Sequence, residues 1–381
     1  MKTRDLSDHV AYQAGRGIEE VARELGREPS EFVKLASNEN PHGPSPAAVD
    51  ALRAAAEAAS SYPKAAHADL VAALADRWHV SDDQIWLANG GDGAIDYLSR
   101  ALLEPDADVL VPAPGFAYYG MSARFHHGDV GEYPLTTADD FAQDAETVLD
   151  AYEGERIVYL TSPHNPTGST IALSEIECIA RETDEETLVV VDEAYGEFAD
   201  VDSAVAIVDG RDGFDAREDV AVIRTFSKAY GLAGLRLGYA IVPGEWAEAY
   251  ARVNTPFAAS ELACRAGLAA LDDDEHVEHT VETARWAREH VADYAETRVW
   301  PSQGNFVLVE VGDASAVATE MQERGVIVRD CTSFGLPDCI RITCGTKDET
   351  RLAVETLNEV LAEFGLPEDA HGERCTEVSD R

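Results

Sequence analysis

The nine residues from Thr187 to Tyr195, Thr-Leu-Val-Val-Val-Asp-Glu-Ala-Tyr, decide the fold class of this chain. They begin with an uninterrupted apolar run and then place two carboxylates in succession. Such a run predicts a strand that is buried on both faces, as in a parallel sheet covered by helices. Asp192 would then lie at the buried end of that strand, where an ionised acid needs a cationic partner.

Similar short apolar runs occur on both sides of this segment and alternate with amphipathic stretches. Strands are predicted at 85–88, 109–111, 157–160, 188–191, 220–224 and 237–242, with helices at 94–103, 174–182 and 245–253. This alternation predicts an α/β domain with a mostly parallel sheet sandwiched by helices. Ligands of such sheets bind at the carboxyl ends of the strands.

The remaining sequence predicts three further parts. Residues 1–40 are expected to form an N-terminal arm that packs with the small domain or a dimer partner, residues 41–257 the large domain, residues 258–365 a smaller α+β domain and residues 366–381 a tail. The predicted elements outside the large domain are helices at 17–25, within 258–295 and at 349–364, and strands at 306–311, 326–329 and 340–343.

The 381 residues include 72 Asp plus Glu and 30 Lys plus Arg, which gives a formal charge of −42. A field of that sign repels phosphate backbones and anionic lipids, so we expect neither nucleic acid nor a membrane as a partner. The repulsion strains a compact fold in dilute salt, but near 1 M salt the Debye length falls to about 3 Å. The composition therefore predicts a halophilic protein in a salt-rich cytoplasm.

The six cysteines show no C-x-x-C pair and no histidines at zinc spacing. We therefore expect neither a metal site nor a disulfide framework. The N-terminal residues lack an apolar signal core, and the chain contains no run of eighteen apolar residues. Both observations favour a cytoplasmic location.

The segment 225–236, Thr-Phe-Ser-Lys-Ala-Tyr-Gly-Leu-Ala-Gly-Leu-Arg, directly follows a predicted strand. It places Lys228, one of only five lysines, near the hydroxyls of Thr225 and Ser227 and eight residues before Arg236. A partly desolvated lysine can form a Schiff base with a carbonyl, and hydroxyls with a guanidinium can hold a phosphate. Taken alone, the segment also fits a solvated lysine and a surface ion pair.

Three other predicted strands are followed by residues that carry chemistry: Asn165, the amides of Gly91 and Asp92, and Phe116. Two prolines flank the asparagine and would fix its amide, the glycine-rich loop can meet an anion at a helix start, and the phenylalanine can lie on an aromatic ring. Each also has an ordinary alternative, namely a strand-to-helix turn, a plain loop and a core aromatic residue. The alternative for Asp192 is a helix cap.

In this combination and order, the strand ends resemble those of the fold-type I pyridoxal-phosphate-dependent aminotransferases, and within them the histidinol-phosphate aminotransferases. Further matches lie at 12–15, 33–41, 61–63, 304–306, 325–330 and 340–343, and the resemblance runs from about residue 8 to 362. It implies a homodimer that transfers the amino group of L-histidinol phosphate to 2-oxoglutarate. The implied products are imidazole acetol phosphate and L-glutamate, in histidine biosynthesis.

The resemblance also implies a role for each matched residue. Lys228 is expected to form a Schiff base with pyridoxal 5′-phosphate and to move the substrate proton, Asp192 to keep the pyridine nitrogen protonated, and Tyr195 with Asn165 to bond the phenolic oxygen of the ring. Phe116 is expected to stack on that ring. The expected phosphate-binding residues are Gly91, Asp92, Thr225, Ser227 and Arg236, joined by Tyr62 of a second subunit.

The expected substrate-binding residues are Tyr12, Asn38, Asn165, Arg329 and Arg341. Arg341 is expected to take the carboxylate of glutamate, and together with Arg329 and Tyr12 the phosphate of histidinol phosphate. The sequence departs from the family pattern at Phe116, where Tyr is usual, at Gly93, which replaces a frequent Glu, and at Gln13-Ala14, where Pro is common.

Three other functions remain open from the sequence. A decarboxylase of a phosphorylated amino acid such as threonine phosphate needs a similar phosphate site, and an aminotransferase for aromatic amino acids shares the fold. A cofactor-binding regulator without catalysis would need a DNA-binding extension, usually basic, and the sequence has none.

Overall fold

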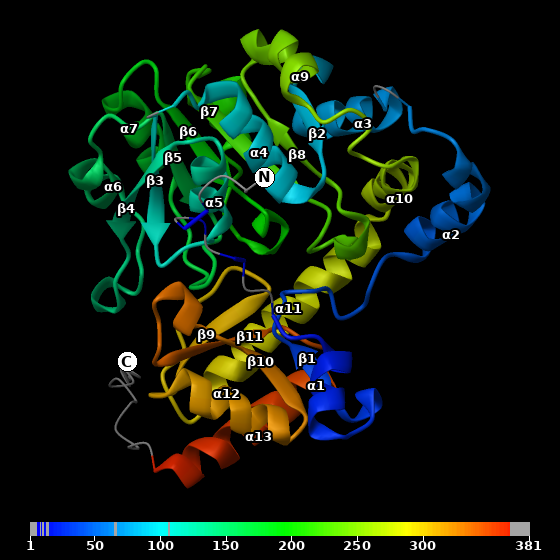
Figure 1. Cartoon of the computed structure of the whole chain (residues 1–381), viewed down its shortest axis with the longest axis vertical. Helices are drawn as coiled ribbons and strands as arrows, with labels where there is room; N and C mark the ends of the chain where they lie inside the picture. The colour runs from blue at the N-terminus through cyan, green and yellow to red at the C-terminus, as the bar shows by residue number, and fades with distance from the viewer. Residues whose placement is uncertain are drawn as a thin grey trace, which may run out of the picture.

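The computed structural model of the chain describes residues 6–7, 9, 11–12, 15–64, 67–105 and 107–365. Two sheets form the centres of two lobes, a large one and a small one (Figure 1). The tail predicted at 366–381 and the unusual pair Gln13-Ala14 lie outside the described residues.

The large sheet has seven strands. Their order across the sheet is β2 (Ile85–Ala88), β8 (Gly238–Ile241), β7 (Val220–Thr225), β6 (Leu188–Asp192), β5 (Ile157–Thr161), β3 (Asp108–Ala113) and β4 (Asp129–Pro134). All neighbours are parallel except at β8, which runs antiparallel to both β2 and β7. The sheet is therefore mostly parallel, as the sequence predicts.

Alternate side chains of β6 enter different hydrophobic clusters, because successive residues of a strand point to opposite faces. Val189 and Val191 pack on one face, while Leu188 and Val190 pack on the other. The first face is covered by α3 (Ala68–Trp78), α6 (Ala145–Ala151), α7 (Leu173–Glu182), α8 (Val205–Asp209) and α10 (Glu261–Leu271), with α2 (Pro46–Ala55) packed on α10. The second is covered by α4 (Gly90–Leu102), α5 (Tyr118–Phe125) and α9 (Ala247–Val253). Burying each such valine stabilises the fold by about 1.5–3 kcal/mol.

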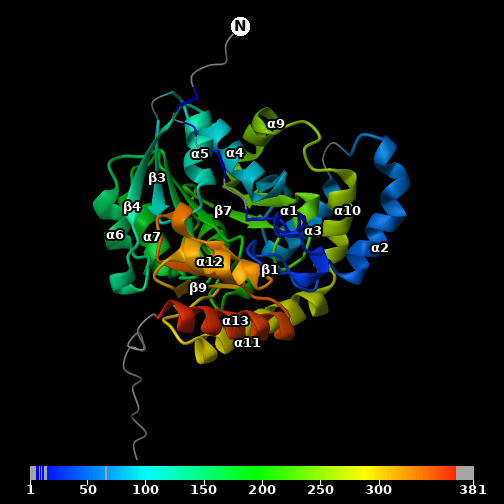
Figure 2. The same cartoon turned by 60° about the horizontal axis from the view of Figure 1, so that its bottom comes forward.

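The small sheet has four strands in the order β1 (Val33–Leu35), β10 (Val326–Asp330), β11 (Cys339–Thr343) and β9 (Phe306–Glu310). β1 comes from the N-terminal part of the chain and pairs in parallel with β10, whereas the other pairs are antiparallel. One face packs on α11 (Asp274–Tyr294), α12 (Ala314–Glu323) and α13 (Lys347–Phe364), and α11 and α13 lie side by side (Figure 2). On the other face, α1 (Ile18–Leu25) covers Ile327.

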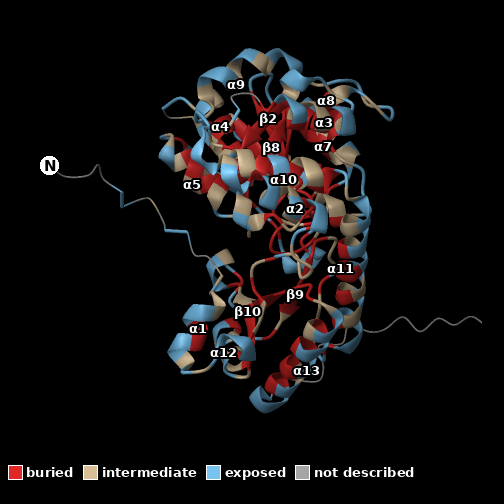
Figure 3. Cartoon of the chain, turned by 90° about the vertical axis from the view of Figure 1, so that its right-hand side faces the viewer, coloured by how far each residue is buried: buried red, intermediate tan, exposed pale blue. Residues whose placement is uncertain are grey.

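Buried residues gather in the two sheets and on the inner faces of their helices, whereas the outer helix faces are exposed (Figure 3). Short 3-10 helices occur at Pro29–Glu31, Ala56–Ser60, Asp82–Gln84, Thr137–Asp139, Gly196–Phe198, Ala233–Leu235, Gly244–Trp246 and Thr332–Phe334. No helix among the described residues is both long and apolar enough to cross a membrane.

Some elements differ from those predicted. The helical region predicted within 258–295 is two helices, α10 and α11, and α11 starts after Asp273, whose carboxylate accepts a hydrogen bond from the His276 amide. The sequence does not predict strand β4, because this strand lies at an edge of the sheet and only Tyr133 in it is buried. It does not predict strand β1 either, because that strand has only three residues.

Candidate active site

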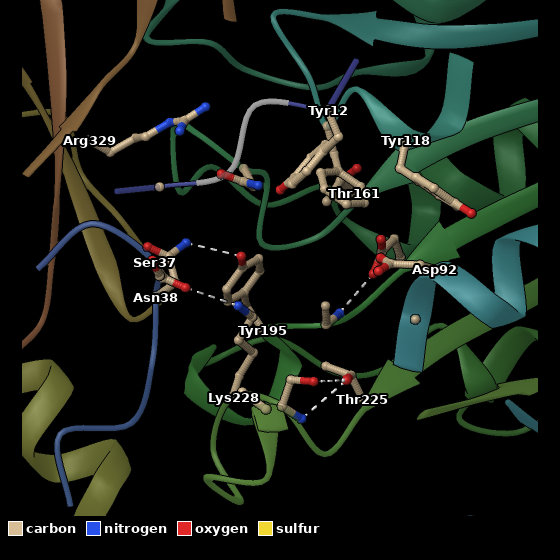
Figure 4. Close-up of a pocket in the computed structure, with 18 of the residues that line it drawn as sticks. Tyr12, Ser37, Asn38, Asp92, Tyr118, Thr161, Tyr195, Thr225, Lys228 and Arg329 are labelled. Atoms are coloured by element: carbon tan, nitrogen blue, oxygen red, sulfur yellow. Dashed lines mark hydrogen bonds between the residues drawn. The ribbon is translucent and has the colours of Figure 1, made fainter. Parts of the chain in front are cut away.

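A cavity of about 560 Å³ lies where the carboxyl ends of three neighbouring large-sheet strands face the small sheet (Figure 4). The last residues of β5, β6 and β7, namely Thr161, Asp192 and Thr225, all line it. Arg329 of β10 and Arg341 of β11 line it from the small sheet. The site thus occupies the sheet edge at which a parallel sheet binds its ligands.

The cavity brings together every predicted site residue except Tyr62. The predicted residues that line it are Tyr12, Asn38, Gly91, Asp92, Phe116, Asn165, Asp192, Tyr195, Thr225, Ser227, Lys228, Arg236, Arg329 and Arg341. The Tyr62 side chain is 85% exposed and lies outside the cavity of its own chain, with its ring centroid 5.0 Å from that of Phe257.

Lys228 follows β7 and lies half-buried in the cavity wall. Its Nζ donates a hydrogen bond to the carbonyl of Ser37 at 3.4 Å and lies 5.4 Å from the centre of the Tyr195 ring. The Tyr195 hydroxyl accepts a hydrogen bond of 3.0 Å from Asn38 Nδ2. The amine and the phenol therefore lie side by side, supported by the segment that follows β1.

Asn38 has a positive φ of 53° and is almost fully buried. Its amide oxygen accepts a hydrogen bond from Thr343 Oγ1 at 3.1 Å, and its carbonyl accepts one from Asn305 Nδ2 at 3.1 Å. Together with the bond to Tyr195, these contacts join the arm, the small sheet and the large sheet. The Asn38 amide was predicted to bind substrate, and in this structure both of its polar atoms hold protein groups.

Arg236, Ser227 and Thr225 form a polar corner at the end of β7. The Thr225 hydroxyl accepts a hydrogen bond from the Ser227 amide at 3.1 Å, and Arg236 Nη1 lies 3.4 Å from Ser227 Oγ. Arg236 Nη2 also pairs with the Asp92 carboxylate at 3.0 Å. Hydroxyls and a guanidinium held together in this way can bind a phosphate ester.

The start of α4 completes this corner. The helix begins at Gly90, four residues earlier than predicted, so the amides of Gly91 and Asp92 belong to its first turn. Amides there have no partner within the helix and point toward an incoming anion. Gly90 has a φ of 74°, and a Cβ added to it would lie 2.5 Å from Arg236 Nη2. Only glycine fits at that position without moving the arginine.

Asp192 ends β6 and is buried at 5% exposure. Its carboxylate accepts hydrogen bonds from the Tyr119 hydroxyl at 2.7 Å and from the Ala194 amide at 3.0 Å. Burial raises the pKa of Asp192 from 3.8 to about 6, although the Tyr119 and Ala194 hydrogen bonds oppose that shift. No ion pair among the described residues involves Asp192, so the site has room for a cationic ligand group beside it.

Arg341 is buried at 5% exposure and reaches from β11 to the loop after β5. Its Nη1 donates a hydrogen bond to the side chain of Asn165, and its Nη2 donates one to the Ala36 carbonyl at 3.0 Å. Nε is buried and makes no hydrogen bond with the described residues. No ion pair of the described residues involves Arg341, and burial lowers its pKa because the charge is desolvated.

Aromatic rings form part of the cavity wall. The Phe116 ring contacts Tyr12 edge-on, with ring centroids 6.1 Å apart, and Tyr119 edge-on at 5.5 Å. Arg329 donates a hydrogen bond to Ser333 Oγ at 2.9 Å. Figure 4 shows Arg329 across the cavity from Asp92 and Thr225.

The sequence did not reveal several residues of the cavity wall: Lys34, Ser37, Tyr118, Tyr119, Thr161 and Phe334. Of these, Tyr119 contacts a predicted catalytic residue directly, because its hydroxyl donates a hydrogen bond to Asp192. Its sequence position indicates only a helix residue after Phe116, and nothing distinguishes it from a core aromatic residue. Thr161 could have been found as the residue that directly follows the strand predicted at 157–160.

The lining of the cavity is basic although the chain is strongly acidic. Five lining residues are basic, namely Lys34, Lys228, Arg236, Arg329 and Arg341, and two are acidic, Asp92 and Asp192. The formal charge of the whole chain is −42. The cavity therefore favours anionic ligands, while the acidic groups are concentrated elsewhere.

The described residues contain no group of three potential metal ligands arranged to hold an ion. Five cysteines are free thiols, and Cys375 lies outside the described residues. Burial raises the pKa of Cys264 to about 12 and also that of Cys344 to about 12, so both stay protonated near neutral pH.

Comparisons with known proteins identify the family. The family model described as aminotransferase class I and II matches residues 30–357. A histidinol-phosphate aminotransferase of Haloarcula marismortui is 66% identical over 363 residues, which cover 95% of this chain and 99% of that protein. The protein of the same name from Haloferax volcanii is 60% identical over 363 residues, which cover 95% of this chain and 99% of that protein.

Solved structures agree with these relatives. The histidinol-phosphate aminotransferase of Sinorhizobium meliloti, solved in complex with pyridoxal-5′-phosphate, superposes with a TM-score of 0.82 at 28% identity and covers 95% of this chain and 98% of that one. A mutant aspartate aminotransferase of Thermus thermophilus superposes with a TM-score of 0.77 at 25% identity and covers 94% and 100%. The chain therefore belongs to the class I and II aminotransferases and, within that family, to the histidinol-phosphate aminotransferases.

Proposed function

We propose that this protein uses pyridoxal 5′-phosphate to transfer the amino group of L-histidinol phosphate to 2-oxoglutarate, giving imidazole acetol phosphate and L-glutamate. The observation that carries the proposal is Arg341, a buried guanidinium that has no carboxylate partner among the described residues. Burying a charge is costly unless it is paired, so this position calls for an anionic ligand. The carboxylate of glutamate and the phosphate of histidinol phosphate both qualify.

The residues present fit the cofactor. The polar corner of Thr225, Ser227 and Arg236 lies at the start of α4, where a phosphate ester can bind. Asp192 is a buried carboxylate with no cation beside it among the described residues, and a protonated pyridine nitrogen would supply one. When bound, pyridoxal phosphate supplies an electron sink for the bonds at the α carbon of the substrate.

The residues of the chain then have separate tasks. Asp192 would hold the proton on the pyridine nitrogen, and Tyr195 with Asn165 would hold the phenolic oxygen of the ring. Lys228 Nζ would hold the cofactor and would take and return the proton at the substrate Cα. Phe116, which meets Tyr12 edge-on in the cavity wall, would cover one face of the cofactor ring. The supporting observation is that all five side chains line one cavity.

Substrate phosphate and cofactor phosphate need separate sites. Thr225 and Asp92, the carboxylate that pairs with Arg236, are on one side of the cavity, and Arg329 is on the other (Figure 4). Arg329 and Arg341 lie directly opposite each other in the β10–β11 pair. We assign to these two arginines, with Tyr12, the phosphate of histidinol phosphate, and to Arg341 the carboxylate of the dicarboxylic substrate.

We also propose that the protein acts as a homodimer in the cytoplasm. Tyr62 and Phe257 form an exposed aromatic pair, with 85% and 51% of their surfaces accessible in the single chain. Large exposed aromatic side chains are typical of protein interfaces. In the dimer, Tyr62 would contact the cofactor phosphate of the second subunit.

Steady-state kinetics with the purified holoenzyme in molar KCl test the proposal. L-Histidinol phosphate, L-histidinol and L-phenylalanine are compared as amino donors to 2-oxoglutarate, and carbon dioxide release is measured from threonine phosphate. We expect kcat/KM for histidinol phosphate to exceed that for histidinol by at least about 100-fold, because losing the phosphate leaves two arginines without an anion. Equal kcat/KM for histidinol phosphate and histidinol would reject the proposal. Carbon dioxide release from threonine phosphate without transamination would also reject it.

A further inference from the structure

Tyr119 is the only side chain among the described residues that donates a hydrogen bond to Asp192. Its hydroxyl lies 2.7 Å from Asp192 Oδ2, while the other carboxylate oxygen is bonded by the backbone amide of Ala194 at 3.0 Å. Each carboxylate oxygen therefore has one fixed donor. The direction in which the carboxylate points depends on Tyr119 as well as on the backbone.

Two neighbouring aromatic rings hold the Tyr119 ring in place. It is 0% exposed, stacks on Tyr159 with ring centroids 4.5 Å apart and an angle of 11° between the ring planes, and meets Phe116 edge-on with centroids 5.5 Å apart. Such aromatic pairs stabilise a fold by more than the area they bury accounts for. Here they prevent the Tyr119 side chain from rotating away from Asp192. The hydroxyl is therefore held at a fixed position.

A second hydroxyl extends the contact. Thr161 Oγ1 lies 2.9 Å from the Tyr119 oxygen. Since the single hydroxyl proton of Tyr119 is donated to Asp192, Thr161 must be the donor in the Thr161–Tyr119 bond. Thr161 and Asp192 are direct partners in the pairing of β5 with β6. The resulting chain, Thr161 to Tyr119 to Asp192, polarises the phenol toward the carboxylate.

We propose that Tyr119 is a positioning residue for the cofactor ring, because it orients the Asp192 carboxylate that faces the ring nitrogen and supports Phe116, which covers the ring face. This inference rests on the proposed cofactor site. Tyr119 is not itself expected to contact the cofactor. It would align two side chains that do, Asp192 and Phe116. It also explains why a buried tyrosine hydroxyl lies next to a buried carboxylate.

The charge of Asp192 depends on the same contact. Burial disfavours the charged form of Asp192. The other titratable groups around it are Asp92, Glu193 and Tyr159, and the two acids, Asp92 and Glu193, also disfavour the charge of Asp192. The Tyr119 hydroxyl opposes them. Without it, the Asp192 carboxyl would protonate at higher pH and lose its attraction for a protonated ring nitrogen.

The test compares Tyr119→Phe with Tyr159→Phe. Both changes remove one hydroxyl from a fully buried tyrosine of the same stacked pair, but the Tyr159 hydroxyl makes no hydrogen bond to Asp192. Each apoenzyme is titrated with pyridoxamine 5′-phosphate, which cannot bond covalently to Lys228, and with its 1-deaza analogue, in which carbon replaces the ring nitrogen. Circular dichroism and thermal unfolding establish that both variants fold.

We expect Tyr119→Phe to bind pyridoxamine phosphate about tenfold more weakly than wild type near pH 7, the usual size of losing a hydrogen bond to a charged group. The acid limb of its binding profile should move to higher pH, and its affinity for the deaza analogue should stay within about twofold of wild type. Tyr159→Phe should resemble wild type with both ligands.

Two results would overturn the inference: wild-type affinity and pH profile in Tyr119→Phe, or equal losses for both ligands, which would indicate a packing defect alone. Both are measured without transamination. A wild-type protein that binds the cofactor but does not transaminate histidinol phosphate would reject the proposed reaction and leave this inference standing.

Discussion

Arg341 on β11 of the small sheet donates a hydrogen bond to the side chain of Asn165, which follows β5 of the large sheet. The two residues are 176 positions apart in the chain. Their contact closes the cavity between the two sheets at the point where the substrate anion is proposed to bind. The guanidinium is therefore oriented by both sheets, and a substitution there should affect recognition more than folding.

Arg341→Lys should lower kcat/KM for glutamate by about 30-fold or more. Lysine keeps the positive charge but loses the planar fork that binds Asn165, the Ala36 carbonyl and an anion together. Initial rates across a range of glutamate concentrations measure the effect. Arg351→Lys, at an exposed arginine of α13, is the matched control and should keep wild-type rates. Wild-type kcat/KM in Arg341→Lys would contradict the assigned role.

Lys228→Ala should abolish transamination and remove the visible absorption change that accompanies covalent binding of pyridoxal phosphate. The reason is that Lys228 Nζ lies 5.4 Å from the centre of the Tyr195 ring, in the cavity that Asp192 also lines. Spectral titration of the variant with pyridoxal phosphate measures this, with Lys347→Ala as the control lysine outside the cavity. A visible band in Lys228→Ala equal to that of wild type would assign the covalent bond to another residue.

Asp192→Asn should make the apoenzyme more stable at pH 8 while weakening cofactor binding. The folded state raises the pKa of Asp192 to about 6, so the unfolded state holds fewer protons between about pH 4 and 6. The stability of the wild type therefore falls as pH rises through that range, and above it the cost is about 3 kcal/mol.

The asparagine variant lacks this cost, so its unfolding free energy should change less between pH 4 and 8. Urea unfolding of both apoenzymes in molar KCl at several pH values gives the comparison. Asp50→Asn, at a carboxylate of α2 that is 76% exposed, is the control and should show the wild-type pH dependence in this range. Parallel pH profiles for wild type and Asp192→Asn would show that the buried carboxyl carries no such cost.

Stability should rise with salt, because the charge of −42 is screened as KCl increases. We expect the midpoint of thermal unfolding to increase by on the order of 10 °C between 0.1 M and 2 M KCl, which corresponds to about 8 kcal/mol for a chain of this size at about 2.1 cal/mol/K of unfolding entropy per residue. Scanning calorimetry at fixed pH measures it. An unchanged midpoint across that range would mean that the surface charge does not strain the fold.

The sequence predicted the cavity well because its central residues end strands. Asp192 and Thr225 are the last residues of buried parallel strands, and such ends meet at one edge of a sheet, so apolar runs followed by polar residues locate the site. Arg341 lies within β11, and its place in the site was inferred from the resemblance to the aminotransferases.

Other features could not be predicted because they depend on packing between distant segments. In the sequence, Tyr119 resembles a core aromatic residue. Its contact with Asp192 exists only in the folded protein, where β5 and β6 pair side by side. The reversed direction of β8 depends on the path of the chain after Arg236, which no local pattern specifies. The contact of Asn38 with Tyr195 requires the small sheet and the large sheet to be in place together.

The most direct test of the account follows the amino group itself. Holoenzyme in molar KCl is incubated with L-histidinol phosphate labelled with ¹⁵N at the amine and with unlabelled 2-oxoglutarate, and the products are analysed by mass spectrometry. We predict that ¹⁵N appears in glutamate in equal amount to the imidazole acetol phosphate formed. Label that stays in histidinol phosphate, while the same enzyme releases carbon dioxide from threonine phosphate, would contradict the assignment.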